Sequence, residues 1–188
     1  MRPCIGLFGA PGSGKSTIAQ LLVDHHGYRQ AGFSDRPKAF AYDVSNLYRQ
    51  LVDDHGGDAE LAKRSDPRVR AELIRIGVAA RTHLDPSVFI GPVLAEAVFM
   101  AETCKQPTVI TDLRFTNEFE ALAAFDFKFC YVARTGVPGV ADIGDWGTDN
   151  WAMRADLGVD NSGDTDELAQ RVEAMVEAFD LAQYGPAW

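Results

Sequence analysis

The sequence of 188 residues has few cysteines and no long apolar run, and both absences narrow the class of protein. Cys4, Cys104 and Cys130 lie far apart, form no CxxC pair and have no histidines at metal-ligand spacing. No stretch approaches the ~20 apolar residues that cross a bilayer, and the first apolar run is too short for a secretory signal. The sequence therefore predicts a cytoplasmic protein with reduced thiols and no membrane partner.

Basic residues are scarce at the C-terminal end. Residues 1–140 hold 16 Lys or Arg and 16 Asp or Glu, whereas residues 141–188 hold 2 basic and 11 acidic residues. The net charge of −9 thus lies entirely in the last part of the chain. This charge distribution argues against a polynucleotide partner. It is compatible with the binding of small anionic ligands by residues 1–140, whose net charge is zero.

Apolar runs bounded by glycine alternate with helical patterns along the chain. Buried strands are predicted at 4–8, 28–33, 107–112 and 128–133. Helices are predicted at about 18–26, 37–51, 67–84, 88–101, 116–124, 151–157 and 165–179. The alternation predicts an α/β fold with a parallel sheet covered by helices on both faces. Ligands of such sheets bind at the carboxyl ends of strands, where Asp112 and the glycine loop after Phe8 fall.

One glycine-rich segment determines the chemistry, and it stands between a predicted strand and a predicted helix. It reads Gly9-Ala10-Pro11-Gly12-Ser13-Gly14-Lys15-Ser16-Thr17. Glycines let backbone N–H groups turn inward around phosphate oxygens, and the helix N-terminus adds positive potential. Lys15 supplies a mobile charge to the β and γ phosphates, and Ser16 offers a hydroxyl to Mg²⁺. The segment predicts a site for a nucleoside triphosphate with Mg²⁺.

Two missing motifs narrow the reaction. No asparagine begins an Asn-Lys-x-Asp segment, so the base reader of a GTP-specific switch is absent. Asp112 is followed by Leu113 and not by glutamate, so the water activator of a motor-type ATPase is absent as well. Phosphoryl transfer to a small acceptor remains, with Asp112 either linked to the metal or paired with Arg114.

Further segments match a known pattern in order along most of the chain. After the glycine-rich loop they are Phe33-Ser34-Asp35-Arg36-Pro37-Lys38, Leu73-Ile74-Arg75-Ile76-Gly77 with Arg81, Thr111-Asp112-Leu113-Arg114-Phe115-Thr116-Asn117-Glu118, Val132-Ala133-Arg134 and Val159-Asp160-Asn161-Ser162-Gly163. Together they resemble the phage deoxynucleoside monophosphate kinase family of P-loop kinases. The resemblance implies one P-loop kinase domain over 1–188, a three-layer sandwich with a helical acceptor-binding region at about 35–105 and a short lid at about 134–153.

The resemblance also implies an activity and a role for each matching residue. The γ-phosphate of ATP would be transferred, with Mg²⁺, to a (deoxy)nucleoside 5′-monophosphate. The reaction would take place in the cytoplasm, which is the host's cytoplasm if the gene belongs to a phage. Lys38, Arg75 and Arg81 would hold the acceptor, with Asp35 and Arg36 beside it. The phosphate loop Gly9–Thr17 would surround the phosphates of ATP, and Asn161 would lie near its adenine. Ser16 and Asp112 would bind the metal. The transferred group and the acceptor would be surrounded by Lys15, Asp112, Arg114, Glu118 and Arg134. The sequence leaves open whether the protein forms a homodimer.

The sequence departs from the family at two places that bear on acceptor identity. Gly77-Val78-Ala79 replaces a Gly-Thr-Asp or Gly-Thr-Glu, and Trp151-Ala152-Met153-Arg154 replaces a His-x-x-Glu. The nucleobase therefore stays open. Two alternatives remain: a P-loop kinase for another metabolite or modified nucleotide, with Asp35 as general base toward a hydroxyl, and a nucleotide-gated binding module without catalysis.

Overall fold

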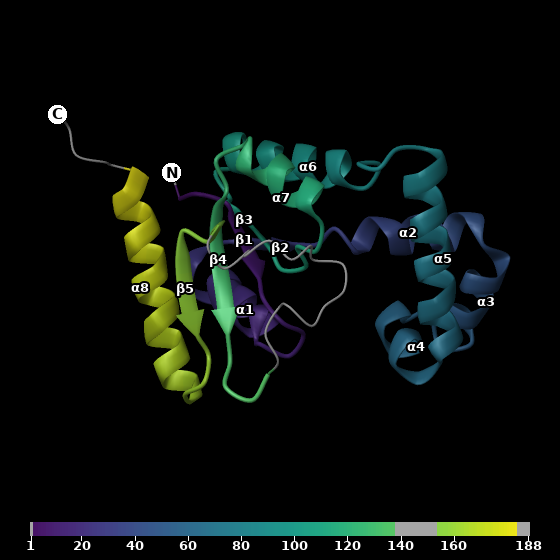
Figure 1. The fold of residues 1–188 in the computed structure, drawn as a ribbon, viewed down its shortest axis with the longest axis horizontal. Helices are drawn as coiled ribbons and strands as arrows, with labels where there is room; N and C mark the ends of the chain where they lie inside the picture. Colours follow the sequence, from purple (N-terminus) through teal and green to yellow (C-terminus); the bar gives the residue numbers. More distant parts are fainter. Residues whose placement is uncertain (1, 138–153, 184–188) are drawn as a thin grey trace. The chain divides into compact units, whose positions relative to one another are not determined.

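The computed structural model describes residues 2–137 and 154–183, and the chain divides into two compact units. The sheet unit comprises Met1–Gly32 and Leu94–Trp188, and the helical unit comprises Phe33–Val93. Figure 1 shows the elements of each unit along the chain. Each unit has a hydrophobic core of its own.

The sheet unit is built on five parallel strands. They are β1 (Ile5–Phe8), β2 (Arg29–Ala31), β3 (Thr108–Ile110), β4 (Lys128–Ala133) and β5 (Leu157–Asp160), in the order β2-β3-β1-β4-β5. Ile5 of β1 is in register with Val109 on one side and Lys128 on the other. β3 and β1 are neighbours in the sheet. The chain runs from β1 to β2, on one side of this pair, and from β3 to β4, on the other side. The carboxyl ends of β1 and β3 thus flank the topological switch point, where open α/β sheets bind ligands.

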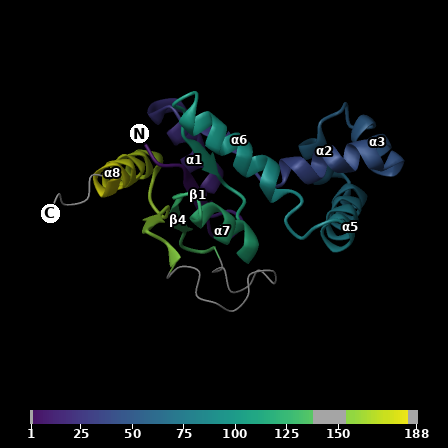
Figure 2. The same ribbon diagram turned by 90° about the horizontal axis from the view of Figure 1, so that it is seen from above.

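Helices cover both faces of this sheet. They are α1 (Lys15–His26), α6 (Ile90–Glu102, which leads back from the helical unit), α7 (Thr116–Ala123) and α8 (Thr165–Gln183). Leu22 of α1 and Val172 of α8 share one core with Leu7 of β1. On the other face Phe119 of α7 stacks on Phe129 of β4, with ring centroids 3.9 Å apart. Figure 2 shows α1 and α7 on opposite sides of β1 and β4. The α/β fold with a parallel sheet between helices is confirmed.

The helical unit contains four helices, three of which begin at a side-chain cap. They are α2 (Asp35–Val44), α3 (Asn46–Asp53), α4 (Ala59–Ser65) and α5 (Pro67–His83). Asp58 accepts the N–H groups of Glu60 and Leu61 to start α4, and Asp66 accepts that of Arg68 to start α5. Such caps stabilise a helix by about 1 kcal/mol each. The core of the unit is formed by Ala41, Tyr48, Leu51, Val52, Ala62, Val69 and Ile76.

The predicted secondary structure is wrong at three places. The helix expected over 37–51 is broken at Ser45, which has extended φ and ψ of −115° and 110° and accepts the N–H of Tyr48 to cap α3. Neither α4 nor β5 is predicted. The helix expected at 151–157 lies partly outside the described residues, and Leu157 begins β5. Of the lid expected at about 134–153, the structure describes only residues 134–137.

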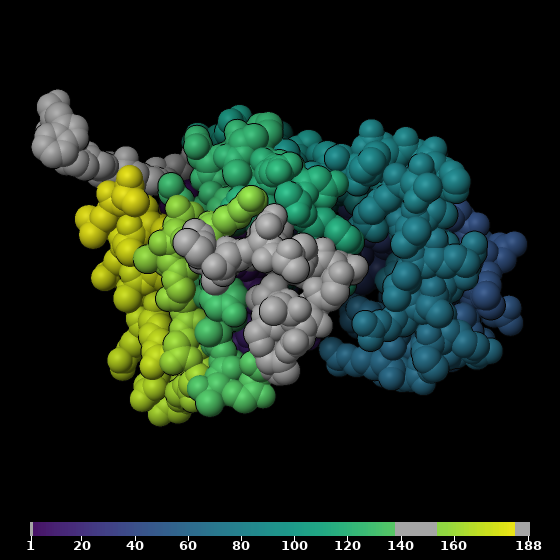
Figure 3. All heavy atoms as spheres, viewed as in Figure 1, coloured from purple at the N-terminus to yellow at the C-terminus, as the bar shows by residue number. Residues whose placement is uncertain are grey.

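The acidic excess of the sequence lies in part on the outer side of α8. Asp166, Glu167, Glu173 and Glu177 are exposed there, and the space-filling view in Figure 3 shows α8 in yellow along one edge of the sheet unit. Such a surface repels a polyanion. Within 2–137 and 154–183, no helix has the length and apolar composition for a membrane crossing.

Candidate functional site

The phosphate loop, Gly9–Gly14, runs from the carboxyl end of β1 to the first residue of α1. Gly9, Gly12 and Gly14 have φ values of 143°, 83° and 99°, a region that L side chains rarely adopt. A Cβ on Gly9 would stand 2.3 Å from the carbonyl oxygen of Val132. The close approach of β4 therefore requires glycine at the first position of the loop.

The N-terminus of α1 is not capped by a side-chain hydrogen bond. Gly14 occupies the cap position without a side-chain hydrogen bond, and the first turn contains no acidic residue. The N–H groups of a first helical turn have no acceptor within the helix and carry the positive end of its dipole. The sequence thus folds here into an anion site of the kind that binds phosphate.

Lys15 lies over this loop. Its Nζ donates to the carbonyl oxygens of Gly9 and Ala10, at 2.8 Å each. Burial, followed by the positive charge of Arg114, lowers the pKa of Lys15 to about 8, although the carboxylate of Asp112 opposes both effects. Asp112 and Arg114 are therefore close enough to Lys15 to influence its charge. These three predicted catalytic residues follow the carboxyl ends of β1 and β3.

Asp112 and Arg114 follow β3 in an irregular segment that Glu118 stabilises. The buried Glu118 accepts the backbone N–H groups of Arg114 (2.8 Å) and Phe115 (3.0 Å) through Oε2. The guanidinium of Arg114 is exposed, whereas Asp112 is half-buried close to Gly32 at the end of β2. A Cβ on Gly32 would come within 3.0 Å of a carboxylate oxygen of Asp112. Glu118 thus supports the segment that presents Arg114, and its contact with an acceptor stays a prediction.

Arg134 and Asn161 follow β4 and β5, so both lie at the same edge of the sheet as the loop. Arg134 is exposed. The buried Asn161 donates from Nδ2 to the carbonyl oxygen of Ser13 at 2.8 Å. This side chain is therefore hydrogen-bonded to the loop backbone, and its proximity to adenine stays a prediction.

Ser16 and Asp112 have the oxygen chemistry that Mg²⁺ prefers. Ser16 is exposed in the first turn of α1, and Asp112 stands at the end of β3. In the part of the chain that the structure describes, no three His, Cys, Asp or Glu side chains gather to hold a metal. Mg²⁺ uses one or two protein ligands together with phosphates and water. This donor set fits Mg²⁺ that arrives with a nucleotide and does not fit an all-protein cage.

Of the six residues predicted to bind the acceptor, Glu118 lies on α7 in the sheet unit, and the other five lie in the helical unit on α2 and α5: Asp35, Arg36, Lys38, Arg75 and Arg81. Lys38 pairs with Glu60 at 2.7 Å and with the exposed Asp35 at 3.2 Å. Arg81 lies 5.2 Å from the centroid of the Phe89 ring. Lys38 and Arg81 thus have partners within the helical unit, and their contact with an acceptor stays a prediction.

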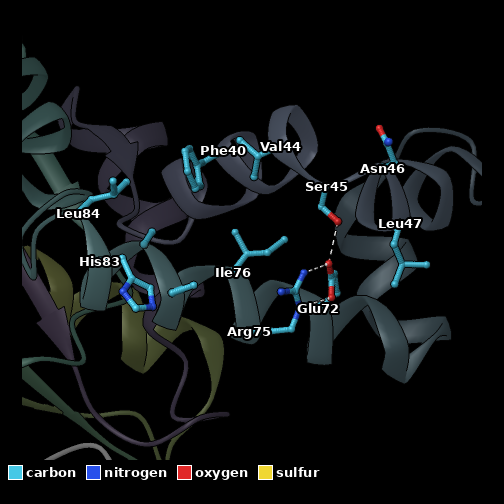
Figure 4. Close-up of a pocket in the computed structure, with 12 residues that line it drawn as sticks. Phe40, Val44, Ser45, Asn46, Leu47, Glu72, Arg75, Ile76, His83 and Leu84 are labelled. Carbon is cyan, nitrogen blue, oxygen red and sulfur yellow. Dashed lines mark hydrogen bonds and ion pairs between the residues drawn. The ribbon is translucent and has the colours of Figure 1, made fainter.

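The helical unit also contains a cavity of about 670 Å³. Phe40, Ile76 and Ala80 contribute apolar walls, and Figure 4 shows Ser45, Glu72 and Arg75 joined by hydrogen bonds. Glu72 accepts from Arg75 Nε (2.8 Å) and Nη2 (2.6 Å) and from Ser45 Oγ (2.7 Å). The bonds from Arg75, then that from Ser45, lower the pKa of Glu72 to about 2. The cavity thus combines apolar walls with a fixed ion pair.

Neither Ser45 nor Glu72 is predicted as a site residue from the sequence. The spacing of Glu72 and Arg75, three residues apart on a helix, is a usable signal for their pairing. Ser45 has a weaker signal, a serine between two apolar helical stretches, which favours a cap over a helix interior.

Two solved structures are similar to this chain over nearly its whole length. One is a candidate kinase from Chloroflexus aurantiacus J-10-fl, with 15% identity and a TM-score of 0.48, covering 95% of this chain and 98% of that one. The other is TT1252 from Thermus thermophilus, with 21% identity and a TM-score of 0.47, and the same two coverages. No family model and no curated protein matches the chain. Its chemistry is therefore inferred from the phosphate loop and the helical unit themselves.

Proposed function

We propose that this protein is a P-loop phosphotransferase that moves the γ-phosphate of ATP to a (deoxy)nucleoside 5′-monophosphate. The observation that carries the proposal is the phosphate loop, with Lys15, Asp112 and Arg114 gathered at the switch point of the sheet. Phosphoryl transfer is catalysed mainly by positioning and by neutralising charge on the moving group. Lys15 and Arg114 supply the positive charge, and the first turn of α1 supplies N–H donors.

The acceptor is assigned to the helical unit. A cavity of about 670 Å³ falls within the roughly 300–1,000 Å³ range of small-molecule sites. Its apolar walls suit the faces of a nucleobase, and Arg75 in its lining suits a phosphate. Lys38 and Arg81 lie on α2 and α5, the helices that contribute Phe40 and Ile76 to the cavity, and would add positive charge for the same phosphate. A phosphate acceptor is already ionised at neutral pH and needs no strong general base, which agrees with Asp35 being exposed and paired with Lys38.

Mg²⁺ would be held by Ser16 and Asp112 together with the phosphates of ATP, and would neutralise charge on the transferred group. Arg134 stands at the end of β4, from which it would reach the same phosphates. Glu118 holds the backbone of Arg114 in place. In this proposal the protein contributes orientation and charge, and the phosphates are the reacting partners.

Substitutions in the helical unit test the assignment of the acceptor. We expect Lys38→Ala and Arg75→Ala to raise the KM of the monophosphate about tenfold or more and to leave the affinity for ATP unchanged, since each removes a charge-assisted bond to phosphate. Arg70→Ala is the matched control for Arg75→Ala, because both are exposed arginines of α5 and only Arg75 lines the cavity. A rise in KM for Arg70→Ala equal to that of the other two would contradict the assignment.

Asp35→Asn separates the proposal from its alternatives. A hydroxyl acceptor needs a general base. If Asp35 is that base, its replacement would lower kcat by a factor on the order of 10² to 10⁴. With a phosphate acceptor we expect less than a tenfold change. A nucleotide-gated binding module would bind ATP tightly and release no ADP with any acceptor.

A further inference from the structure

The side chain of Asn161 contacts the phosphate loop from a distant part of the sequence. Its Nδ2 donates to the carbonyl oxygen of Ser13 at 2.8 Å, across 148 residues. Its backbone N–H donates to the carbonyl oxygen of Ala133 at 2.7 Å. Asn161 is thus fixed at the end of β4 by its backbone while its buried side chain binds the loop.

The peptide between Ser13 and Gly14 gives this hydrogen bond a consequence for the loop. The chain has no cis peptide bond among the described residues, and in a planar trans peptide the C=O and the N–H point in opposite directions. A donor that holds the carbonyl of Ser13 on one side therefore turns the N–H of Gly14 away from Asn161. Gly14 caps α1, where N–H groups form the anion site.

Gly14 is required by the same contact. A Cβ at this position would stand 1.9 Å from Nδ2 of Asn161. The glycine therefore lets the amide of Asn161 approach the loop backbone, in addition to allowing the positive φ of 99°. The loop and Asn161 fit each other as a pair.

We infer that Asn161 is a positioning residue for the phosphate loop, which orients the Gly14 N–H toward a bound polyphosphate whatever base the nucleotide carries. The inference rests on the proposed function, because it requires the loop to hold a polyphosphate. It differs from a role in reading adenine in a measurable way. A residue that orients the loop affects every polyphosphate equally, whereas a residue that reads the base affects ATP alone.

The test measures dissociation constants for Mg²⁺ complexes of ATP, GTP and inorganic tripolyphosphate by titration calorimetry. The variants are Asn161→Ala and Asn161→Leu, the second of which keeps an apolar group of similar size in place of the amide. Asp164→Ala is the control, because Asp164 accepts the N–H of Glu167 at the start of α8 and its loss weakens the same segment without removing the Asn161 donor. Melting temperatures are recorded for all variants.

We expect both Asn161 variants to weaken binding of all three ligands by the same factor, roughly fivefold to tenfold, as for the loss of one net hydrogen bond. Asp164→Ala lowers the melting temperature and leaves the three constants unchanged. A loss confined to ATP, no loss at all, or an equal loss in Asp164→Ala overturns the inference. Wild-type protein that binds none of the ligands overturns the proposed function as well, whereas binding of ATP without transfer to any acceptor overturns the proposed function alone.

Discussion

Replacement of Lys15 by methionine separates the functional cost of this residue from its structural cost. Methionine keeps much of the length of the side chain and removes the charge. In the wild type Nζ donates to Gly9 and Ala10, and on binding of ATP it would exchange these neutral acceptors for phosphate oxygens. A charge-assisted hydrogen bond contributes about 1.5–3 kcal/mol. After subtraction of the bonds given up, a net loss of about 1–2 kcal/mol corresponds to a roughly 5- to 30-fold rise in Kd for ATP.

The effect of the same substitution on stability has the opposite sign. The folded pKa of Lys15, about 8, lies below the ordinary value of 10.5, so the unfolded chain binds more protons between these two pH values. The charged lysine therefore destabilises the fold below pH 8, and this cost disappears as the pH rises to 10.5. With allowance for solvent screening the cost is about 1 kcal/mol. We expect Lys15→Met to unfold in urea at pH 7 with a free energy equal to or slightly above that of the wild type.

Titration calorimetry with ATP and Mg²⁺, together with urea denaturation, measures both effects. Lys128→Met is the control, since Lys128 stands at the amino end of β4, away from the loop end of the sheet. We also expect the ATP affinity of the wild type, but not of Lys15→Met, to fall as the pH rises above 8. Unchanged affinity in Lys15→Met, or joint loss of affinity and stability, would refute this account of the residue.

Three further substitutions test other parts of the structure. Arg114→Ala should lower the rate of transfer by at least about 10³-fold, as for other arginines that stabilise a moving phosphoryl group, with an unchanged circular-dichroism melt because its guanidinium is exposed. Glu72→Gln should lower the free energy of unfolding in urea by about 1–2 kcal/mol at pH 7. That difference should shrink as the pH falls from 4.5 toward 2, since the lowered pKa makes the contribution of Glu72 vanish on protonation; a constant difference would contradict the ion pair with Arg75. Gly9→Ala should cost about 2 kcal/mol of stability and most of the ATP affinity, because its Cβ would clash with Val132; wild-type values for both would show that the loop tolerates a side chain there.

The parts of the structure that could be predicted have local signals. The loop motif, the apolar run before it and the helical periodicity after it predict β1 and α1, and Gly27 ends α1 with the positive φ expected of a cap glycine. The steps from Val69 to Ala80 likewise predict α5, because a buried stripe repeats along its whole length. In each case the residues within and next to the element are sufficient to predict it.

The missed parts depend on partners far away in the sequence. β5 has four residues, of which Val159 is buried and Gly158 and Asp160 are exposed, so its pairing with β4 is not visible in its own pattern. The bond from Asn161 to Ser13 joins the two ends of the sequence, and neither segment specifies the other. The break at Ser45 depends on Glu72 of another helix, which binds the serine hydroxyl. Short segments and polar contacts of this kind are set by tertiary structure.

Acceptor-dependent release of ADP is the most direct measure of phosphoryl transfer to a nucleoside monophosphate. The wild-type protein is incubated with ATP and Mg²⁺ and, in turn, with each deoxy- and ribonucleoside 5′-monophosphate, and ADP and the product are quantified by chromatography. We expect at least one monophosphate to stimulate ADP release at least tenfold and to be recovered as its diphosphate in an amount equal to the ADP. ADP release that no monophosphate stimulates, or a product phosphorylated on a hydroxyl group, would contradict the proposed function.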